Sequence, residues 1–288
     1  MSLQTRIRAL ETLGDGRVLV LSAASLTLDL LPMLHDTLRV LGHSERLCVL
    51  LQSEGGDADA ARRIALRLHA GTDRLVLLVP ERCGAAGTLL ALAAHEIVVG
   101  PMARFAPIAP IAPSLPLEGP DGPVMLSARD LREGWRVVRD DHGLDETAAR
   151  TQALHWLTAH VFPTTLTAFH RHTLELARIG DALLSLADAG RPADARAAIV
   201  QAFLQVDEAA VPALTADDLR RMGLPVVDAA ALAAPMQDAL QALQSLVGPA
   251  SHGSGDDAGC DALIATADGV QRRRQRPHAP AGVWEQAA

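Results

Sequence analysis

The stretch ERCGAAGTLLALAAHEIVVGP, Glu81 to Pro101, combines a tight turn, a helix and a strand, and it decides the fold class. The turn runs through Gly84 to Gly87, the apolar run after it predicts a helix, and EIVVGP predicts a buried strand. Strand and helix patterns also alternate ahead of it: RVLVLSAA at 17–24, LDLLPMLHDTLRVLG at 28–42, RLCVLLQS at 46–53, DADAARRIALRLHAG at 57–71 and DRLVLLVP at 73–80. This alternation predicts parallel βαβ units with helices covering the sheet, which is an α/β fold.

The pattern changes beyond this region. Residues 103–121 are rich in proline and predict an extended loop rather than a helix or a central strand. Helical patterns dominate after the loop, and Thr215 with Asp218 predicts a capped helix start. We therefore expect three regions: an α/β core at 1–126, a mainly helical region completing the same domain at 127–247, and a flexible linker and basic tail at 248–288.

The expected tail contains two features of its own. DALIATADGV, at 261–270, is compatible with a late strand. A small basic cluster follows it, formed by Arg272, Arg273, Arg274 and Arg276. A solvated tail is the favoured interpretation of this cluster, and contact with an acidic partner or a neighbouring subunit is the alternative.

Composition argues against several classes of function. The 288 residues carry a formal charge of -8 and only 2% aromatic side chains, which disfavours a nucleic-acid partner. The three cysteines and the histidines show no metal-ligand spacing, so we expect no metal and no cofactor. The sequence shows neither a secretory signal nor an apolar run long enough to span a bilayer, so we expect a cytoplasmic protein without a transmembrane segment.

Two glycine turns mark the expected site. SEGG, Ser53 to Gly56, ends one predicted strand, and CGAAGT, Cys83 to Thr88, follows the next. In an open α/β sheet, ligands bind at the carboxyl ends of the strands, and glycines there let backbone N–H groups approach a ligand closely. The pair of turns predicts donors for an oxyanion, although each turn alone is equally an ordinary strand-to-helix connection.

The region from Arg46 to Pro113 resembles the Clp protease/crotonase superfamily, in particular its signal peptide peptidase A and serine dehydrogenase proteinase branch. Members of this branch have a strand ending in GG and a later S-G-G-T or S-A-G-T before L-x-A-L-A-A-D-E-I-V-M-x-P. Here the corresponding segments are Gly55–Gly56 and AAGTLLALAAHEIVVGP at 85–101. With VFPTTLTAFHRHTLELARIGDALL at 161–184 and TADDLRRMGLPVV at 215–227, the likeness runs from about Arg17 to Val227. It implies a Clp/crotonase-like repeated βαβ core with a helical C-terminal region.

The departures from the family pattern fall on the catalytic triad. The resemblance aligns the family's serine with Ala85, its aspartate with Ala109, and its histidine with a position near Ala210. Nucleophilic catalysis needs a nucleophile, a base and an orienting group within hydrogen-bond reach, and alanine supplies none of them. The positions that the resemblance assigns to oxyanion and peptide binding are Gly55, Gly56, Ala86 and Gly87.

Other side chains near the turns are weaker candidates for catalysis. Cys83 lies on the strand side of its turn, where a cysteine is usually buried and inert. Ser53 is expected to cap the following helix, and Ser114 lies in the proline-rich loop without an evident base. His95 takes the position of the family's usual acidic residue after the elbow helix, where we expect it near the surface.

Three functions are compatible with the sequence. The favoured one is a catalytically degenerate serine-peptidase-like protein, a pseudo-enzyme that binds a peptide or protein or serves as a subunit of an assembly. The second is an active serine endopeptidase of the serine dehydrogenase proteinase type that carries an engineered Ser→Ala change at position 85. The third is a crotonase-like acyl enzyme, with Glu54 and Asp57 as weak candidate carboxylates. We also expect a homo-oligomer, or a hetero-oligomer with an active relative.

Overall fold

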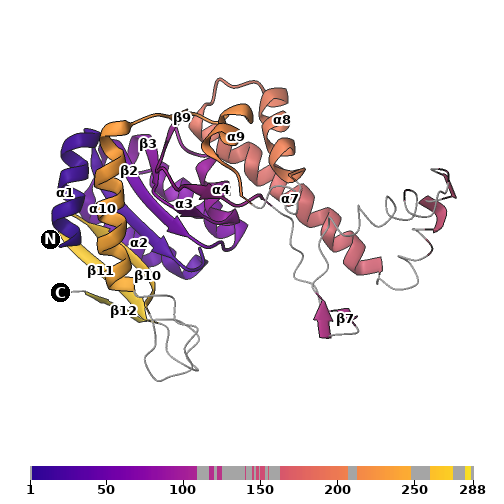
Figure 1. The fold of residues 1–288 in the computed structure, drawn as a ribbon, viewed down its shortest axis with the longest axis horizontal. Helices are drawn as coiled ribbons and strands as arrows, with labels where there is room; N and C mark the ends of the chain where they lie inside the picture. The colour runs from indigo at the N-terminus through magenta and orange to yellow at the C-terminus, as the bar shows by residue number, and fades with distance from the viewer. Residues whose placement is uncertain are drawn as a thin grey trace. The chain divides into compact units, whose positions relative to one another are not determined.

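The computed structural model describes most of the chain (Figure 1). The described residues are 2–108, 117–119, 122–124, 140, 145, 147–148, 150–152, 155, 163–206, 213–247, 260–274 and 283–286. The chain divides into two compact units, one formed by Met1–Ile108 with Ile179–Ala288 and the other by Ala109–Arg178. The domain division at 126/127 and 247/248 stays a prediction from the sequence.

Within the described residues, ten strands form the main sheet of the first unit. Its path runs β12-β11-β10-β1-β2-β3-β5-β9, and β4 pairs with both β2 and β6. The strands are β1 (Arg17–Ala23), β2 (Ser44–Ser53), β3 (Thr72–Val79), β4 (Arg82–Cys83), β5 (Glu96–Val99), β6 (Arg104–Phe105), β9 (Val226–Val227), β10 (Cys260–Thr266), β11 (Gly269–Arg274) and β12 (Val283–Gln286).

The centre of the sheet is parallel, as the alternating pattern predicts. Cys48 of β2 pairs with Val18 of β1 and with Val76 of β3. On the other side of β3, Leu77 pairs with Ile97 of β5. These strands are almost continuously hydrophobic because helices cover both of their faces. The α/β fold class is therefore confirmed.

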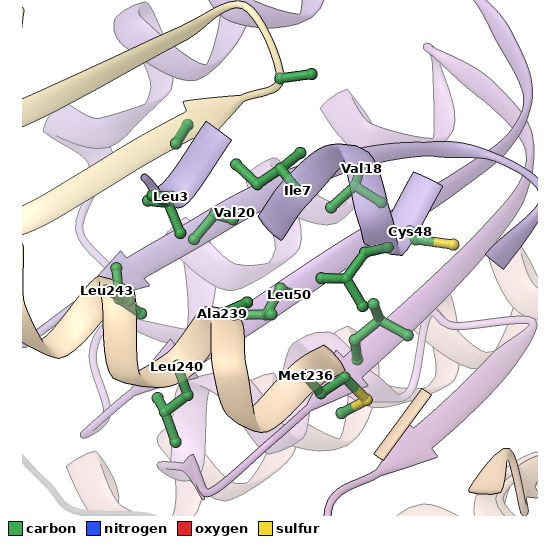
Figure 2. Close-up of a cluster of buried hydrophobic side chains, with 14 of the residues drawn as sticks. Leu3, Ile7, Val18, Val20, Cys48, Leu50, Met236, Ala239, Leu240 and Leu243 are labelled. Carbon is green, nitrogen blue, oxygen red and sulfur yellow. The ribbon is translucent and has the colours of Figure 1, made fainter. Parts of the chain in front are cut away.

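Two helices from opposite ends of the sequence cover one face. α1 (Leu3–Gly14) and α10 (Ala230–Val247) lie side by side (Figure 1) and share a buried cluster with alternate residues of the central strands. Figure 2 shows Ile7 of α1 and Met236 of α10 in this cluster with Val20 and Leu50 of the sheet. The sequence analysis did not predict α1, although its buried residues Leu3, Ile7 and Leu10 recur at helical spacing.

The opposite face is covered by η1 (Leu28–Leu30), α2 (Leu31–Leu41), α3 (Ala58–His69) and α4 (Ala85–Ala91). A Cβ on Gly87 of α4 would lie 3.5 Å from Leu51 Cδ2, and Leu51 points to the face opposite Leu50 because successive strand residues alternate. The residue before α3 is Asp57, whose carboxylate accepts the Ala60 N–H at 2.8 Å. Asp57 is therefore the cap of this helix, and Ser53, which was expected to cap it, is not.

The C-terminal strands extend the sheet in antiparallel fashion. β10 pairs with β1, with Val20 opposite Ala265, and β11 and β12 follow it outward. Residues 260–274 are thus folded, although the sequence placed them in a linker and tail. Arg273 is only 5% exposed and forms hydrogen bonds with Asp261 and Asp29, so the solvated interpretation is wrong for this member of the basic cluster.

The remaining described elements are helical or short. They include the helices α7 (Pro163–Ala187), α8 (Ala193–Leu204) and α9 (Ala216–Arg221), and in the second unit β7 (Leu117–Gly119) pairs with β8 (Gly122–Val124). α9 begins with the capping box expected at Thr215 and Asp218, in which each residue's side chain accepts the other's backbone N–H. This local prediction is confirmed.

Candidate functional site

The elbow before α4 is held against the turn that follows β2. Gly84 caps α4, donates its N–H to the Ser53 carbonyl at 2.7 Å, and accepts the Thr88 N–H at 2.8 Å. A Cβ on Gly84 would lie 2.1 Å from the carbonyl carbon and oxygen of Glu54. Real side chains do not tolerate such a contact with backbone, so only glycine lets the two turns approach this closely.

The glycine pair after β2 is tied to the loop that follows β1. Leu26 donates its N–H to the Gly55 carbonyl and accepts the Asp57 N–H, both at 2.9 Å. Gly56 has φ of 137°, and a Cβ there would lie 2.4 Å from the Leu26 nitrogen. Both the positive φ and the close approach require glycine at this position.

The turns leave several backbone donors open. The Gly55 N–H is bonded to Ser53 Oγ at 3.2 Å, so Gly55 is not a free donor. In the described part of the chain, the N–H groups of Gly56, Ala85 and Ala86 have no hydrogen-bond acceptor. The last two belong to the first turn of α4, where a helix leaves its N–H groups without internal partners. Ala86 and Gly87 are buried, and Ala85 is half-buried.

A cleft of about 270 Å³ lies beside these turns, at the carboxyl ends of β2, β4 and β6. Its lining residues are Ser53, Glu54, Arg82, Cys83, Gly84, Arg104, Ala106 and Ala213. The strand ends meet here because the three strands are parallel, with Ser53 paired to Cys83 and Cys83 to Phe105. Gly84 belongs to the lining, whereas the five site positions predicted from the sequence lie outside it: Gly55, Gly56, Ala85, Ala86 and Gly87.

Neither nucleophilic side chain of the cleft is available for attack. Ser53 is 1% exposed, and its Oγ donates to the Gly55 carbonyl at 2.9 Å while accepting the Gly55 N–H. Cys83 is also 1% exposed, and burial raises the pKa of its thiol to about 12. The thiolate, which is the reactive form, is therefore almost unpopulated at neutral pH. Ser114, Ala109 and Ala210 lie outside the described residues.

His95 lies at the other end of the sheet. Its Nδ1 accepts the Leu75 N–H at 3.0 Å, and its ring centroid is 5.2 Å from that of His69. Burial, and next the neighbouring His69, lower the pKa of His95. Leu75 precedes the carboxyl end of β3 at Val79 by four residues, or roughly 13 Å along the strand. His95 therefore cannot act as a base at the elbow.

The charged residues of the cleft are unequally paired. Arg82 donates to Glu54 Oε1 at 2.7 Å and lies 3.6 Å from Glu81 Oε1, and the hydrogen bond with Glu54 is the main reason why the pKa of Arg82 is raised. Arg104 is exposed and, within the described residues, lies within 4.0 Å of no carboxylate. The sequence analysis did not single out either arginine, because their adjacency depends on the pairing of β4 with β6.

Comparisons with known proteins leave the chemistry open. No family model and no curated protein matches the sequence. A solved structure of a serine-to-alanine mutant of 1510-N, a membrane-bound stomatin-specific protease, is similar at 16% identity and a TM-score of 0.43, over 78% of this chain and 81% of that one. So remote a likeness supports no statement about catalysis, and the resemblance to a peptidase family stays a prediction.

Two further findings concern membranes and metals. None of the described helices combines the length and the apolar character needed to cross a bilayer. Among the described residues, no three His, Cys, Asp or Glu side chains gather in a way that could hold a metal ion.

Proposed function

We propose that this chain is a catalytically inactive, peptidase-like protein whose cleft binds a short peptide segment. The observation that carries the proposal is the state of the cleft's nucleophiles. Ala85 stands at the elbow, Ser53 Oγ is occupied by Gly55, and the Cys83 thiol is buried with its pKa at about 12. Among the described residues, no histidine lines the cleft. A site with this composition is suited to holding a ligand rather than cleaving it.

The open backbone donors support a peptide as the ligand. Peptide carbonyls are hydrogen-bond acceptors, and Ala85, which follows the lining residue Gly84 in the chain and is half-buried, has an N–H without an acceptor among the described residues. The volume of about 270 Å³ is slightly below the range of drug-sized pockets, roughly 300–1,000 Å³, so a short segment is the appropriate size.

Nothing in the cleft favours the crotonase-like alternative. An acyl enzyme of that kind needs a carboxylate aimed at the substrate. Glu54 is held by Arg82 at 2.7 Å, and Asp57 accepts the Ala60 N–H as a helix cap. Both candidate carboxylates therefore have structural partners.

Assembly with a second copy or with a related subunit is the other part of the proposal. β12 is an edge strand, and no described strand pairs with its outer side. An open edge offers unpaired backbone groups to another chain.

The first prediction tests the inactive site by restoring its missing hydroxyl. Ala85→Ser supplies a serine, but none of the described lining residues is a histidine, so we expect the serine to stay protonated and to be a poor nucleophile. Open backbone donors alone give on the order of 10³-fold catalysis over water, which a peptidase assay does not detect. We expect neither the original protein nor Ala85→Ser to hydrolyse casein or to react with a fluorophosphonate probe.

Ala106→Ser is the matched control, because it adds a hydroxyl to the same cleft away from the elbow. We expect all three proteins to behave alike. Peptidase turnover in Ala85→Ser but not in Ala106→Ser would contradict the proposal. It would show that a working base reaches the elbow, and it would favour an active endopeptidase with an engineered alanine.

A further inference from the structure

We propose that Arg104 binds a carboxylate of the cleft's ligand, so that the cleft selects peptides by a negative charge. This inference rests on the proposed function, because it names the class of peptide that the same cleft would bind. It concerns a residue to which neither a sequence motif nor a comparison assigns a role.

The sheet register places two guanidinium groups next to each other. Arg82 of β4 and Arg104 of β6 are paired residues on neighbouring parallel strands, where backbones lie about 4.8 Å apart. Paired residues point to the same face of a sheet, so both side chains lie at one cleft, which both of them line. Adjacent like charges are unfavourable unless an anion compensates them.

The protein compensates only one of the two charges. Arg82 contacts two carboxylates, Glu54 at 2.7 Å and Glu81 at 3.6 Å. The second Glu81 oxygen accepts a hydrogen bond from Gln244 at 3.3 Å, so Glu81 also has partners within the protein. Arg104 has no carboxylate within 4.0 Å among the described residues, and its charge is therefore open to a ligand.

The backbone that carries Arg104 is firmly held. Its N–H donates to the Glu81 carbonyl at 2.7 Å. The next residue, Phe105, is fully buried and exchanges two hydrogen bonds with Leu214, at 3.0 and 2.7 Å, and Ala106 donates to the Cys83 carbonyl at 2.8 Å. A fixed backbone reduces the entropy that binding must remove, which favours a specific contact.

Carboxylate is the group that this arrangement fits. The planar guanidinium offers two parallel N–H donors that match the two oxygens of a carboxylate. In a peptide ligand this group is either the C-terminal carboxylate or the side chain of Asp or Glu. The cleft also retains Glu54, which disfavours ligands of greater negative charge at the same point.

The test uses the full chain and three pools of random tetrapeptides, all acetylated at the N-terminus. One pool ends in a free carboxylate and contains no Asp or Glu, the second is amidated and contains no Asp or Glu, and the third is amidated with one fixed internal Glu as its only acidic residue. The immobilised protein captures each pool, and mass spectrometry quantifies the bound peptides. We expect capture of the free-acid pool, the internal-Glu pool or both to exceed that of the uncharged pool by about tenfold.

Arg104→Gln should remove this preference, whereas Arg17→Gln should keep it. Arg17 is the matched control, since it is an exposed strand residue outside the cleft and its replacement by Gln removes the same charge. The preference should also weaken as salt is raised, because Arg104 is exposed.

The outcomes separate this inference from the proposed function. If the uncharged pool binds as well as the others, or if Arg104→Gln keeps the preference, Arg104 does not bind a carboxylate of the ligand. The proposed peptide binding is unaffected by either result. If none of the pools is captured, the peptide-binding function fails and the inference fails with it. A preference for one charged pool identifies the source of the carboxylate.

Discussion

At the scale of single residues, glycine and alanine define the candidate site. Gly84 and Gly56 are the positions at which a Cβ would collide with backbone of a neighbouring turn. The sequence predicted that both turns would belong to one site, since each follows a strand of the same parallel sheet. It could not predict that Gly84 touches Glu54. These residues are 30 positions apart in the sequence, and their contact depends on how closely the two turns pack.

A Gly84→Ala variant tests that contact. The added methyl group would lie 2.1 Å from the Glu54 carbonyl and 2.3 Å from the Gly55 nitrogen. Both neighbours are backbone atoms, which cannot move aside as the end of a flexible side chain can. We expect a loss of about 3 kcal/mol in the free energy of unfolding, measured by urea denaturation. Gly269→Ala is the control, because nothing lies within 4 Å of its added Cβ and its φ is not positive. Its unfolding midpoint should stay close to that of the original protein, and equal midpoints for both variants would show that the two turns separate at little cost.

At the scale of elements, the sequence identified the parallel centre but not the antiparallel extension. Local apolar patterns predicted β1, β2, β3 and β5, since each is a buried run bounded by turn residues. Residues 261–270 were compatible with a strand, yet no local signal could indicate that β10 pairs with β1, more than 230 residues earlier. The basic composition of β11 suggested solvent, whereas Arg273 is buried by its pairing with Asp261 and Asp29.

Replacing Arg273 tests how much this ion-pair group contributes to the extension. Arg273→Met keeps much of the side-chain volume but leaves Asp261, only 18% exposed, without its cation. Removing one partner of a buried pair typically costs about 3 kcal/mol of unfolding free energy, because the other charge stays buried. Arg8→Met is the control, since Arg8 and Asp268 form a loose pair at 3.9 Å with both side chains exposed. Calorimetry should show a much lower Tm for Arg273→Met than for Arg8→Met.

The pH dependence of stability should change with the same substitution. Burial acts to raise the pKa of Asp29, but the Thr27 hydroxyl and Arg273 outweigh it and leave the pKa below its ordinary value of 3.8. A lowered carboxyl pKa stabilises the folded state above pH 3.8, and this stabilisation is lost as the pH falls through the folded-state pKa. Arg273→Met should therefore lose less stability than the original protein when both are acidified through this range. An equal or steeper acid loss in the variant would contradict the role assigned to Arg273.

At the scale of the whole molecule, the two ends of the chain complete the first unit. α1 and α10 cover one face together, and the C-terminal strands continue the sheet from β1 outward to β12. The core therefore depends on segments that the family resemblance, from about Arg17 to Val227, does not include. This explains why the sequence analysis recognised the parallel centre of the sheet but not the borders of the fold, whereas the predicted roles of the site residues stay predictions. Among the described strands β12 is the last on this side of the sheet, and its outer side is the edge proposed for the assembly.

We expect the full chain to be at least a dimer at micromolar concentration, as measured by light scattering after gel filtration. If two copies pair through β12 about a two-fold axis, a residue at one end of the strand faces the other end of the partner strand. Gln286→Lys then places a lysine in the paired edge of both copies, a charge that opposes edge-to-edge pairing, and should weaken the dimer by about tenfold. Val40→Lys makes the same addition of charge on α2, at a side chain that is 81% exposed, and should leave the dimer intact if the edge is the interface. Dissociation by Val40→Lys alone would instead assign the interface to α2, and a strict monomer of the original protein would refute assembly while leaving the inactive cleft as proposed.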